Sequence, residues 1–324
     1  MKYAGGVDVG GTNIVCGIVD ETGRVVASRK YATAPERGAA DVLERIGETI
    51  EQLRKEAGVA EEDLAAVGLG IPGLLDPEKG ISVRAVNLGW SGVPVAETLG
   101  RRLGKPAFID NDVRMYVYGE AIAGAGRGRS YVFGVTIGTG LASAFVQKGE
   151  LYYGHRFMAG EIGHVPVEYP ERFPCNCGQV GCLETVVSAT GIAKQARARI
   201  ERGEPSLLAT RFPDLASLRS VDVTEACLAG DALAKDVLDR TGRALGAALA
   251  WAVPLLSPDA IVIGGGGALA GAALLVPMQE ELESRMLQNY QGQFVVKTAE
   301  LQDDAGLIGS ALWALNRSRA AQQP

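Results

Sequence analysis

Residues 2–19 read KYAGGVDVGGTNIVCGIV, and residues 131–147 read YVFGVTIGTGLASAFVQ. Both stretches predict two strands joined by a tight turn of glycine and threonine, at residues 10–12 in the first and 138–140 in the second. The copies lie roughly 130 residues apart, a period far too long for a solenoid, so they indicate a weak internal duplication. We therefore expect two α/β lobes with a cleft between them, and a boundary around residues 119–129.

The rest of the chain alternates between helical and strand patterns. Apolar side chains recur at helical spacing between Asp41 and Lys55. Similar patterns predict strands at residues 24–30, 65–70, 107–110 and 260–263, and helices at residues 95–103, 113–123 and 232–253. Residues 316–324 are polar, and we expect them to form a frayed tail.

Composition and charge argue against several classes of protein. A chain of 324 residues with 47% hydrophobic side chains can bury one large core or two medium ones. The net charge of −6, with no basic stretch, argues against nucleic acid as a partner. The cysteine count of five is odd, no signal peptide precedes the first strand, and the longest apolar run, residues 244–256, is short and contains Pro254. We therefore expect a soluble, cytoplasmic protein with no membrane partner.

The most specific motif is His164-x10-Cys175-x-Cys177-x4-Cys182. The chain has only two histidines and five cysteines, and this stretch holds one histidine and three cysteines. Four nitrogen and sulfur ligands fill a tetrahedral zinc site and leave no position for a catalytic water, so such a metal would shape a loop. The alternative is a chance cluster of buried thiols, but the Pro/Gly/Asn-rich segment PCNCGQVGC is poorly suited to core packing.

The first glycine turn, Asp8-Val9-Gly10-Gly11-Thr12-Asn13, is a candidate phosphate site. Glycines let backbone N–H groups approach phosphate oxygens, the Thr12 hydroxyl adds a donor, and Asp8 could hold a hydrated Mg²⁺. The alternative is an ordinary tight hairpin, since Gly-Gly is a common turn. The second turn, at residues 138–140, favours the phosphate interpretation because it repeats the pattern.

The triplet Asp110-Asn111-Asp112 stands at an expected strand-to-helix junction. Asn and Asp are common helix caps, and capping alone explains one of the three residues. A carboxylate at a strand end also suits a general base that accepts a hydroxyl proton. Spacing alone leaves the cap and the site interpretations equally open.

A third glycine cluster, Gly264 to Gly267, follows an expected strand. It does not match the G-x-G-x-x-G dinucleotide fingerprint. The Walker-type phosphate loop is also absent, since the only Gly-Lys pair, Gly104-Lys105, precedes a proline. A glycine run at a helix N-terminus can still host a flat nucleotide.

Taken together, these motifs resemble the ROK family (repressors, ORFs, sugar kinases), and within it the bacterial glucokinases. The resemblance covers nearly the whole chain in the same order. It is carried by Asp8-x-Gly10-Gly11-Thr12-Asn13, Asn111-Asp112, Gly138-Thr139-Gly140, Gly160-Glu161-x-Gly163-His164, Cys175-x-Cys177-Gly178-x2-Gly181-Cys182-Leu183-Glu184 and the Gly264 run.

The resemblance implies an α/β fold of the two-lobed actin/hexokinase (ribonuclease H-like) type with an interlobe cleft. It assigns residues 1–118 and a C-terminal helix at about 306–318 to a small lobe, and residues 119–305, with a zinc loop at 160–184, to a large one. The implied activity is ATP-dependent phosphorylation of a hexose, most of all glucose to glucose 6-phosphate. Structural Zn²⁺, Mg²⁺ with ATP, and a homo-oligomer (dimer or tetramer) are implied as well.

The resemblance also implies roles for single residues. Asp112 would be the general base, and the sugar would contact Asn111, Asp112, Glu161, His164 and Glu184. The zinc ligands would be His164, Cys175, Cys177 and Cys182. ATP and its Mg²⁺ would contact Asp8, Gly10, Gly11, Thr12, Asn13, Gly138, Thr139, Gly140, Gly265 and Gly266. Asn13 stands where many relatives carry lysine.

Alternatives to a glucokinase stay open at this point. Another hexose, such as fructose, allose or N-acetylmannosamine, could be the substrate, because the same carboxylates hold several hydroxyl patterns. A sugar sensor without catalysis is less favoured because Asp112 is present, and a repressor because Asp8 stands too close to the start for a preceding helix-turn-helix. We also expect loss of the zinc to impair sugar binding far more than ATP binding, since the glycine turns lie outside the loop in sequence.

Overall fold

The computed structural model describes residues 1–321, which divide into two compact units. Unit 1 comprises Met1–Arg129, Ala144–Tyr152 and the chain from Glu300 onward, and unit 2 comprises Ser130–Ser143 and Tyr153–Ala299. The boundary expected at residues 118 and 119 falls inside helix α3 (Asp112–Ile122). This helix packs against α10 (Ala305–Ala320), so the whole of α3 and the loop to Arg129 stay with unit 1.

The main sheet of unit 1 has the strand order β3-β2-β1-β4-β8. Its strands are β1 (Tyr3–Val9), β2 (Asn13–Asp20), β3 (Val25–Ala32), β4 (Leu64–Ile71) and β8 (Ala107–Asn111). The first three pair antiparallel, while β4 pairs parallel with both β1 and β8. The antiparallel hairpin around residues 10–12 is therefore joined to a parallel α/β layer.

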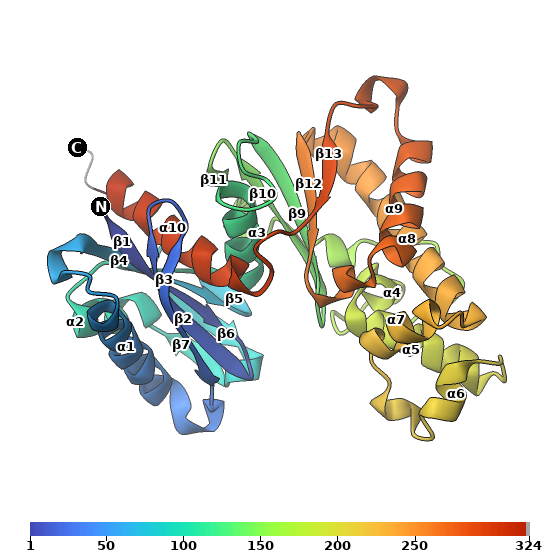
Figure 1. Ribbon diagram of the computed structural model, residues 1–324, viewed down its shortest axis with the longest axis horizontal. Coiled ribbons are helices and arrows are strands. Elements are labelled where there is room, and N and C mark those ends of the chain that lie inside the picture. The colour runs from blue at the N-terminus through green and yellow to red at the C-terminus, as the bar shows by residue number, and fades with distance from the viewer. Residues whose placement is uncertain (322–324) are drawn as a thin grey trace. The chain divides into compact units, whose positions relative to one another are not determined.

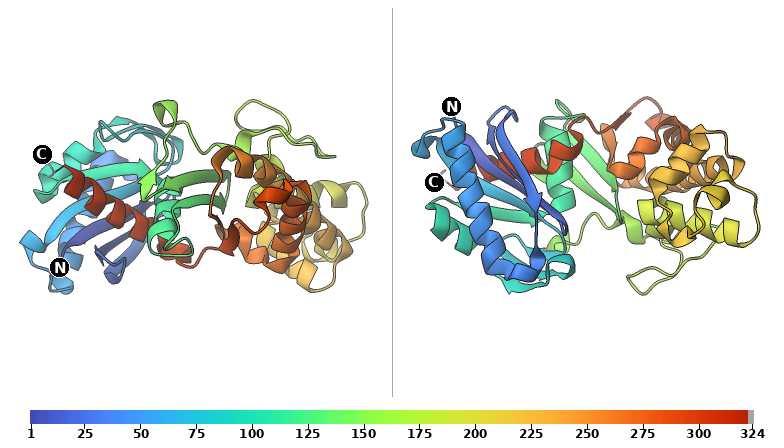
Figure 2. Two further views of the ribbon diagram at one scale, coloured as in Figure 1. Left: turned by 90° about the horizontal axis from the view of Figure 1, so that it is seen from above. Right: turned by 60° about the horizontal axis from the view of Figure 1, so that its bottom comes forward.

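Helices cover both faces of this sheet, and two neighbouring glycines in β1 show which helix lies on each face. A Cβ at Gly5 would lie 3.1 Å from Ile50 of α1 (Gly38–Glu56), whereas a Cβ at Gly6 would lie 2.2 Å from the Leu307 carbonyl oxygen of α10. Successive residues of a strand point to opposite faces, so α1 and α10 lie on opposite sides of the sheet. Figure 2 shows α10 in front of this sheet in its left view and α1 in front in its right view.

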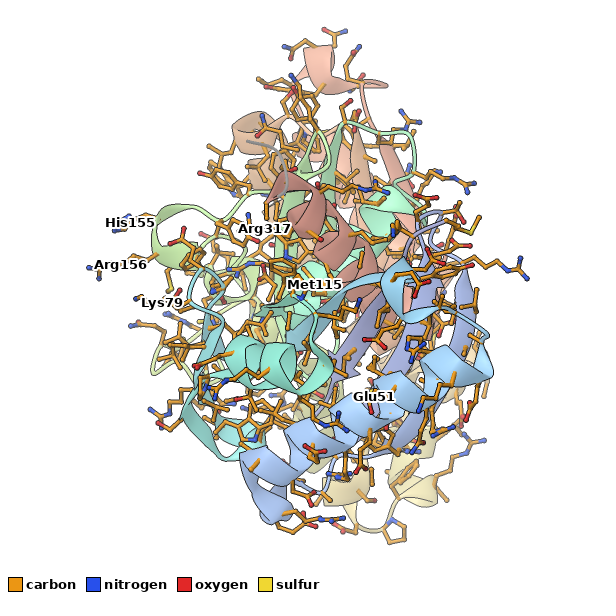
Figure 3. All side chains as sticks on the ribbon, turned by 90° about the vertical axis from the view of Figure 1, so that its left-hand side faces the viewer. Glu51, Lys79, Met115, His155, Arg156 and Arg317 are labelled. Carbon is orange, nitrogen blue, oxygen red and sulfur yellow. The ribbon has the colours of Figure 1, made fainter. Side chains whose placement is uncertain are left out.

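The other elements of unit 1 complete its core. Trp90, Val95 and Leu99 pack with α1 and the main sheet in one cluster. Glu51, labelled on α1 in Figure 3, pairs with Arg102 of α2 at 3.0 Å. The elements are the antiparallel sheet β5 (Leu74–Asp76), β6 (Ile81–Ala85) and β7 (Trp90–Val93), the helix α2 (Val95–Leu103), and the 3₁₀ turns Pro35–Arg37, Glu61–Asp63, Val86–Leu88 and Gln302–Asp304.

The strands of the second five-stranded sheet, labelled in Figure 1, have the order β11-β10-β9-β12-β13. Residues 144–152, which include most of β10 and all of β11, belong to unit 1, and the other strands belong to unit 2. β12 pairs parallel with β9 and with β13. Its strands are β9 (Tyr131–Ile137), β10 (Leu141–Gln147), β11 (Glu150–Leu151), β12 (Ala260–Gly264) and β13 (Val295–Thr298). The parallel pair β9 and β12 places two glycine-rich segments at the same edge of this sheet.

The helices of unit 2 pack closely through small residues. A Cβ at Gly242 would lie 2.3 Å from the Leu274 carbonyl oxygen, and one at Gly246 would lie 2.2 Å from that of Met278, so α8 and α9 approach backbone to backbone. The helices are α4 (Glu184–Val187), α5 (Ala189–Glu201), α6 (Leu207–Arg211), α7 (Ser220–Leu228), α8 (Ala232–Leu256) and α9 (Ala272–Arg285). The 3₁₀ turns are His155–Phe157, Ile162–His164, Leu215–Ser217, Gly266–Ala270 and Gln288–Tyr290.

Most expected strands and helices occur within a few residues of their predicted bounds, but the expected tail does not. α10 runs to Ala320, and the Asn316 amide donates to Glu150 at 3.0 Å, so the prediction of a frayed segment is wrong for residues 316–320. Residues 322–324 lie outside the described chain. Among residues 1–321, no helix is long and apolar enough to cross a membrane.

Candidate functional site

In unit 1 the predicted site residues meet at the carboxyl ends of three parallel strands. Asp8 of β1 lies beside Gly70 of β4, and Gly70 lies beside Asp110 of β8. One step further, Ile71 lies beside Asn111. Ligands of α/β sheets bind outside the carboxyl ends of the strands, so this edge is where the topology favours a site.

The turn at residues 10–12 is fixed by its own backbone and by Thr33. The Gly10 N–H donates to the Asn13 carbonyl at 2.9 Å, and the Thr33 hydroxyl donates to the Gly10 carbonyl at 2.6 Å. The Thr33 N–H donates to the Thr12 carbonyl at 2.9 Å. The side chains of Thr12 and Asn13 remain exposed, so the turn is rigid and accessible at once. Thr33 was not predicted, because its role depends on strand β3 returning to the turn.

The triplet at residues 110–112 divides into three separate roles. Asp110 is fully buried, and its Oδ1 accepts hydrogen bonds from the Asn111 N–H at 2.7 Å and from the Arg114 guanidinium at 3.2 Å. Asn111 is the cap of α3, since its Oδ1 accepts the N–H groups of Val113 and Arg114 at 3.0 and 3.3 Å. Asp112 begins the helix, and its Oδ1 also accepts the Val113 N–H at 3.0 Å. The cap and the buried ion pair thus account for the first two residues and leave Asp112 as the candidate base.

Burial shifts the two carboxylates at this edge toward their neutral forms. It raises the pKa of Asp112, although hydrogen bonds from Val113 and Asn111 oppose the shift. Burial, followed by the nearby charges of Asp112 and Asp303, raises the pKa of Asp8 from its ordinary 3.8 to about 6, against the opposing charge of Lys30. A carboxylate with a raised pKa is a stronger base, which suits proton abstraction.

Asp303 was not predicted. It reaches this edge because η9 (Gln302–Asp304) leads into α10, whose Gly306 would carry a Cβ only 3.0 Å from the Asp8 carboxylate. The sequence does carry a signal for this contact. The acidic pair at residues 303 and 304 directly precedes an apolar helical segment rich in small residues, which can pack closely against the sheet.

We expect Asp8→Asn to stabilise the ligand-free protein at high pH. The raised pKa means that the folded state favours protonated Asp8, so the ionised carboxylate destabilises the fold increasingly as the pH rises from about 4 to about 6. The shift of the Asp8 pKa from 3.8 to about 6 predicts that Asp8→Asn raises the free energy of unfolding by roughly 3 kcal/mol at pH 8 and by roughly 1 kcal/mol at pH 4.5. Denaturant unfolding of both proteins at the two pH values measures it.

The matched control is Asp303→Asn, which removes only one of the charges acting on Asp8. Its gain at pH 8 should have the same sign and be smaller. An Asp8→Asn gain that is equal at both pH values, or a loss at pH 8, would contradict the assigned shift.

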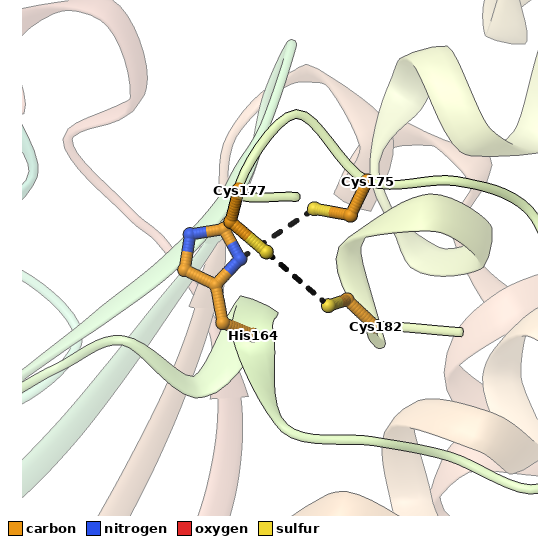
Figure 4. Close-up of side chains that lie close together, drawn as sticks. All are labelled: His164, Cys175, Cys177 and Cys182. Atoms are coloured by element: carbon orange, nitrogen blue, oxygen red, sulfur yellow. Dashed lines mark hydrogen bonds between the residues drawn. The ribbon is translucent and has the colours of Figure 1, made fainter. Parts of the chain in front are cut away.

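In unit 2 the structure brings His164, Cys175, Cys177 and Cys182 together (Figure 4). Their ligand atoms all lie within 4.8 Å of one another. His164 Nδ1 lies 3.7 Å from Cys175 Sγ, and Cys177 Sγ lies 3.6 Å from Cys182 Sγ. Zinc bonds of about 2.0–2.3 Å in a tetrahedron imply ligand separations of about 3.5–3.8 Å. These two separations match a tetrahedral zinc site, and the 4.8 Å bound on the others places all four side chains close enough to share one ion.

Short backbone contacts shape the loop around this cluster. The Cys175 N–H donates to the Gln179 carbonyl at 2.8 Å, and the Gly178 N–H donates to the Cys175 carbonyl at 3.0 Å. Gly178 has a φ of +91°, which an L side chain rarely adopts. A bridge between Pro166 and Cys182 closes the loop. Cys182 is buried and Cys177 is exposed, so the cluster extends from the protein interior to the surface.

The two predicted glutamates lie on different sides of the cluster. Glu161 Oε2 lies 3.7 Å from His164 Nε2, the ring nitrogen that faces away from the sulfur atoms. Glu184 begins α4, its Oε2 accepts the Leu141 N–H at 3.0 Å, and its Oε1 lies 3.8 Å from Cys175 Sγ. Residues that hold the outer nitrogen of a ligand histidine fix its ring, and Glu161 is placed for that role.

A strained segment precedes Gly160 and Glu161. Arg156 and Phe157 have φ values of +54° and +61°, although neither is glycine. His155 and Arg156 project outward from this segment (Figure 3). Such strain gathers at functional sites, and no feature of the sequence predicted it here.

The second turn and the glycine run meet at the carboxyl ends of β9 and β12. Gly264 lies beside Thr136 in the parallel register. A Cβ at Gly265, whose φ is +81°, would lie 2.6 Å from the Ile137 carbonyl oxygen, while a Cβ at Gly266 would meet nothing within 4 Å. Residues 138–140 follow Ile137 directly, so the run borders the turn and Gly266 offers an open surface.

The expectation that loss of the zinc affects ATP binding much less than sugar binding depended on the turn at residues 138–140 lying outside the loop at 160–184 in sequence. In the structure the two segments are in contact. Glu184 contacts the turn through Leu141 and the metal cluster through Cys175. Sequence separation hid this link, because the contact joins residues that lie far apart along the chain.

Comparisons with known proteins agree over almost the whole chain. The sequence pattern of the ROK family matches residues 4–317. A glucokinase from Halalkalibacterium halodurans is 35% identical over 98% of this chain and 96% of its own length. A glucokinase from Thermotoga maritima is 36% identical over 94% of this chain and 95% of its own length.

A solved structure gives the same result in three dimensions. The ROK family glucokinase from Streptomyces griseus, in complex with glucose and AMPPNP, is 30% identical, with a TM-score of 0.78 over 97% of this chain and 99% of that one. The expected fold class, α/β of the two-lobed actin/hexokinase type, is confirmed by this likeness.

Proposed function

The chain belongs to the ROK family, and we propose that it is an ATP-dependent glucokinase, which converts glucose and ATP to glucose 6-phosphate and ADP. The observation that carries the proposal is Asp112. Its carboxylate stands at the first position of α3, at the carboxyl edge of the sheet, with a pKa raised by burial. The capping role belongs to Asn111 and the buried ion pair to Asp110, so Asp112 is available for chemistry.

In the proposed reaction, Asp112 accepts the proton of the sugar 6-hydroxyl. The hydroxyl oxygen forms a bond to the γ-phosphorus of ATP, and the bond from that phosphorus to the ADP oxygen breaks. Phosphoryl transfer depends mainly on positioning and electrostatics, so the remaining residues bind and orient. The proposed sugar contacts are Asn111, Asp112, Glu161, His164 and Glu184. The proposed nucleotide contacts are Gly10, Gly11, Thr12, Asn13, Gly138, Thr139, Gly140, Gly265 and Gly266.

Two metals belong to this proposal. A structural Zn²⁺ on His164, Cys175, Cys177 and Cys182 is supported by the number and type of these ligands and by the approach of their ligand atoms to within 4.8 Å of one another. Mg²⁺ bound with ATP neutralises phosphate charge, and Asp8 is the proposed protein contact for it. The expected homo-oligomer and cytoplasmic location stay predictions.

A kinase assay across hexoses tests the proposal. With ATP and Mg²⁺, glucose should give the highest kcat/KM, and fructose, allose and N-acetylmannosamine should each be at least about tenfold poorer, because a site built for one hydroxyl pattern leaves polar groups unpaired with another. ADP formation, coupled to an indicator enzyme, measures all four. A higher kcat/KM for another hexose would replace glucose as the substrate, and no turnover with any hexose would favour a sugar-sensing protein.

A further inference from the structure

The turn at residues 138–141 is held by the segment that directly follows the metal ligands. The Ala189 N–H donates to the Gly138 carbonyl at 2.9 Å, and the Thr190 hydroxyl donates to the Thr139 carbonyl at 2.8 Å. The Leu141 N–H donates to Glu184 at 3.0 Å. Three residues of the turn are thus bonded to a segment that begins two positions after Cys182.

The Glu184 carboxylate lies directly against the turn. A Cβ at Gly140 would lie 2.7 Å from its Oε2, so any side chain there would displace the carboxylate. Behind it, a Cβ at Gly163 would lie 2.1 Å from the Leu141 carbonyl oxygen and 3.4 Å from Glu184 Cβ. Glycine at both positions lets the turn, Glu184 and the start of the metal loop pack in contact.

The metal cluster anchors the helix that carries Glu184. The carbonyl of the ligand Cys182 accepts the Thr185 N–H at 3.0 Å and the Thr185 hydroxyl at 2.7 Å. The Leu183 N–H donates to the Val165 carbonyl, next to His164, at 2.9 Å. A fixed Cys182 therefore fixes the first turn of α4, and with it the position of Glu184.

The two oxygens of Glu184 have separate environments. Oε1 lies 3.8 Å from Cys175 Sγ, on the side of the metal cluster. Oε2 accepts the Leu141 N–H at 3.0 Å, on the side of the turn. A single carboxylate therefore contacts both the cluster and the turn.

We propose that Glu184 is a positioning residue for the phosphate-binding turn, through which the metal cluster orders residues 138–141. Oε2 holds the turn through Leu141, and Oε1 faces Cys175 of the cluster. The inference rests on the proposed function for the identity of the ligands, but the coupling itself concerns the fold of unit 2. It extends the role of the metal from the sugar loop to the nucleotide turn.

The test uses the metal-loaded protein and three variants. Glu184→Ala removes the acceptor of the Leu141 N–H, and Glu184→Gln retains an amide oxygen in its place. Glu171→Ala is the control, because Glu171 is a carboxylate of the same loop that pairs with Arg202 at 2.7 Å. Amide hydrogen exchange of residues 138–143 and the Kd of a non-hydrolysable ATP analogue are measured, with metal content checked in each variant.

Glu184→Ala should exchange at Leu141 about tenfold faster or more and bind the analogue about tenfold more weakly, since a hydrogen bond to a charged acceptor is lost. Glu184→Gln should stay within about threefold of wild type in both, and Glu171→Ala should leave both unchanged. Unchanged exchange and Kd in a metal-loaded Glu184→Ala protein overturn the proposal. If Glu184→Ala does not fold, Glu184→Asp, which is one methylene too short to reach Leu141, serves the same test.

This outcome is separable from that of the kinase assay. Faster exchange at Leu141 supports the coupling even where no hexose is phosphorylated. Conversely, glucose phosphorylation by wild type with unchanged exchange in Glu184→Ala retains the proposed function and rejects the coupling.

Discussion

Asp112→Asn should reduce kcat by about 10²- to 10⁴-fold, while the protein still folds and binds glucose. The reason is the loss of a general base, which contributes about that much to rate. Asparagine keeps the shape of the side chain and can still accept the Val113 N–H through its amide oxygen, so α3 should begin as before. Steady-state kinetics, together with calorimetric binding of glucose, measure both parts.

The control lies two residues earlier and makes the same atomic replacement. Asp110→Asn weakens the fully buried pair with Arg114, and breaking such a pair destabilises a protein by about 3–5 kcal/mol. It should therefore lower the unfolding free energy much more than Asp112→Asn does. An Asp112→Asn protein that keeps more than about a tenth of wild-type kcat would refute the assignment of the base, because general bases contribute far more than that.

The local features of this fold were readable from the sequence because they depend on short-range chemistry. The strands around residues 10–12 and 138–140 follow from apolar runs on both sides of glycine turns, and β9, β10 and α2 have the predicted bounds. The metal cluster was readable for another reason, since rare residue types gathered in one loop. In both cases the residues that predict the feature lie within about 20 positions of one another, as is typical of turns and metal-binding motifs.

Features that depend on long-range packing were not readable. Three such interactions join distant segments through the strand order or a helix end. They are the hydrogen bond of Thr33 to Gly10, the charge of Asp303 that raises the pKa of Asp8, and the hydrogen bond of Leu141 to Glu184. The three short strands between Leu74 and Val93 were also missed. Short strands broken by glycines carry little periodicity of their own.

The polar end of the chain shows the same limit. Residues 316–320 look like a tail, yet Ser318 is buried and Asn316 bonds to Glu150, so tertiary contacts extend α10. The candidate site was predicted one residue at a time, and the structure supplies the connections between those residues. These connections change what is expected when the metal is lost.

Cys177→Ser should remove the metal and raise the KM for both glucose and ATP. Wild type should contain one zinc per chain, and the variant should contain well under one, because a tetrahedral structural site needs all four ligands. The loop should then lose its order, and α4 with it, since the Cys182 carbonyl holds Thr185. We expect each KM to rise about tenfold or more, as a change of about 1.4 kcal/mol in binding would give. Metal analysis and kinetics with each substrate varied in turn measure this.

Cys177 suits this test because its side chain is exposed, so serine changes little besides the metal ligand. Cys227→Ser is the matched control, since Cys227 is a cysteine outside the cluster, and it should leave metal content and both KM values unchanged. Faster amide exchange in Cys177→Ser should be confined to residues 138–143 and 160–191. Faster exchange in β1 and α1 as well would indicate general unfolding. A raised glucose KM with an unchanged ATP KM would show that the turn holds its shape without the metal. The contact of Glu184 with Leu141 would then not couple the turn to the metal cluster.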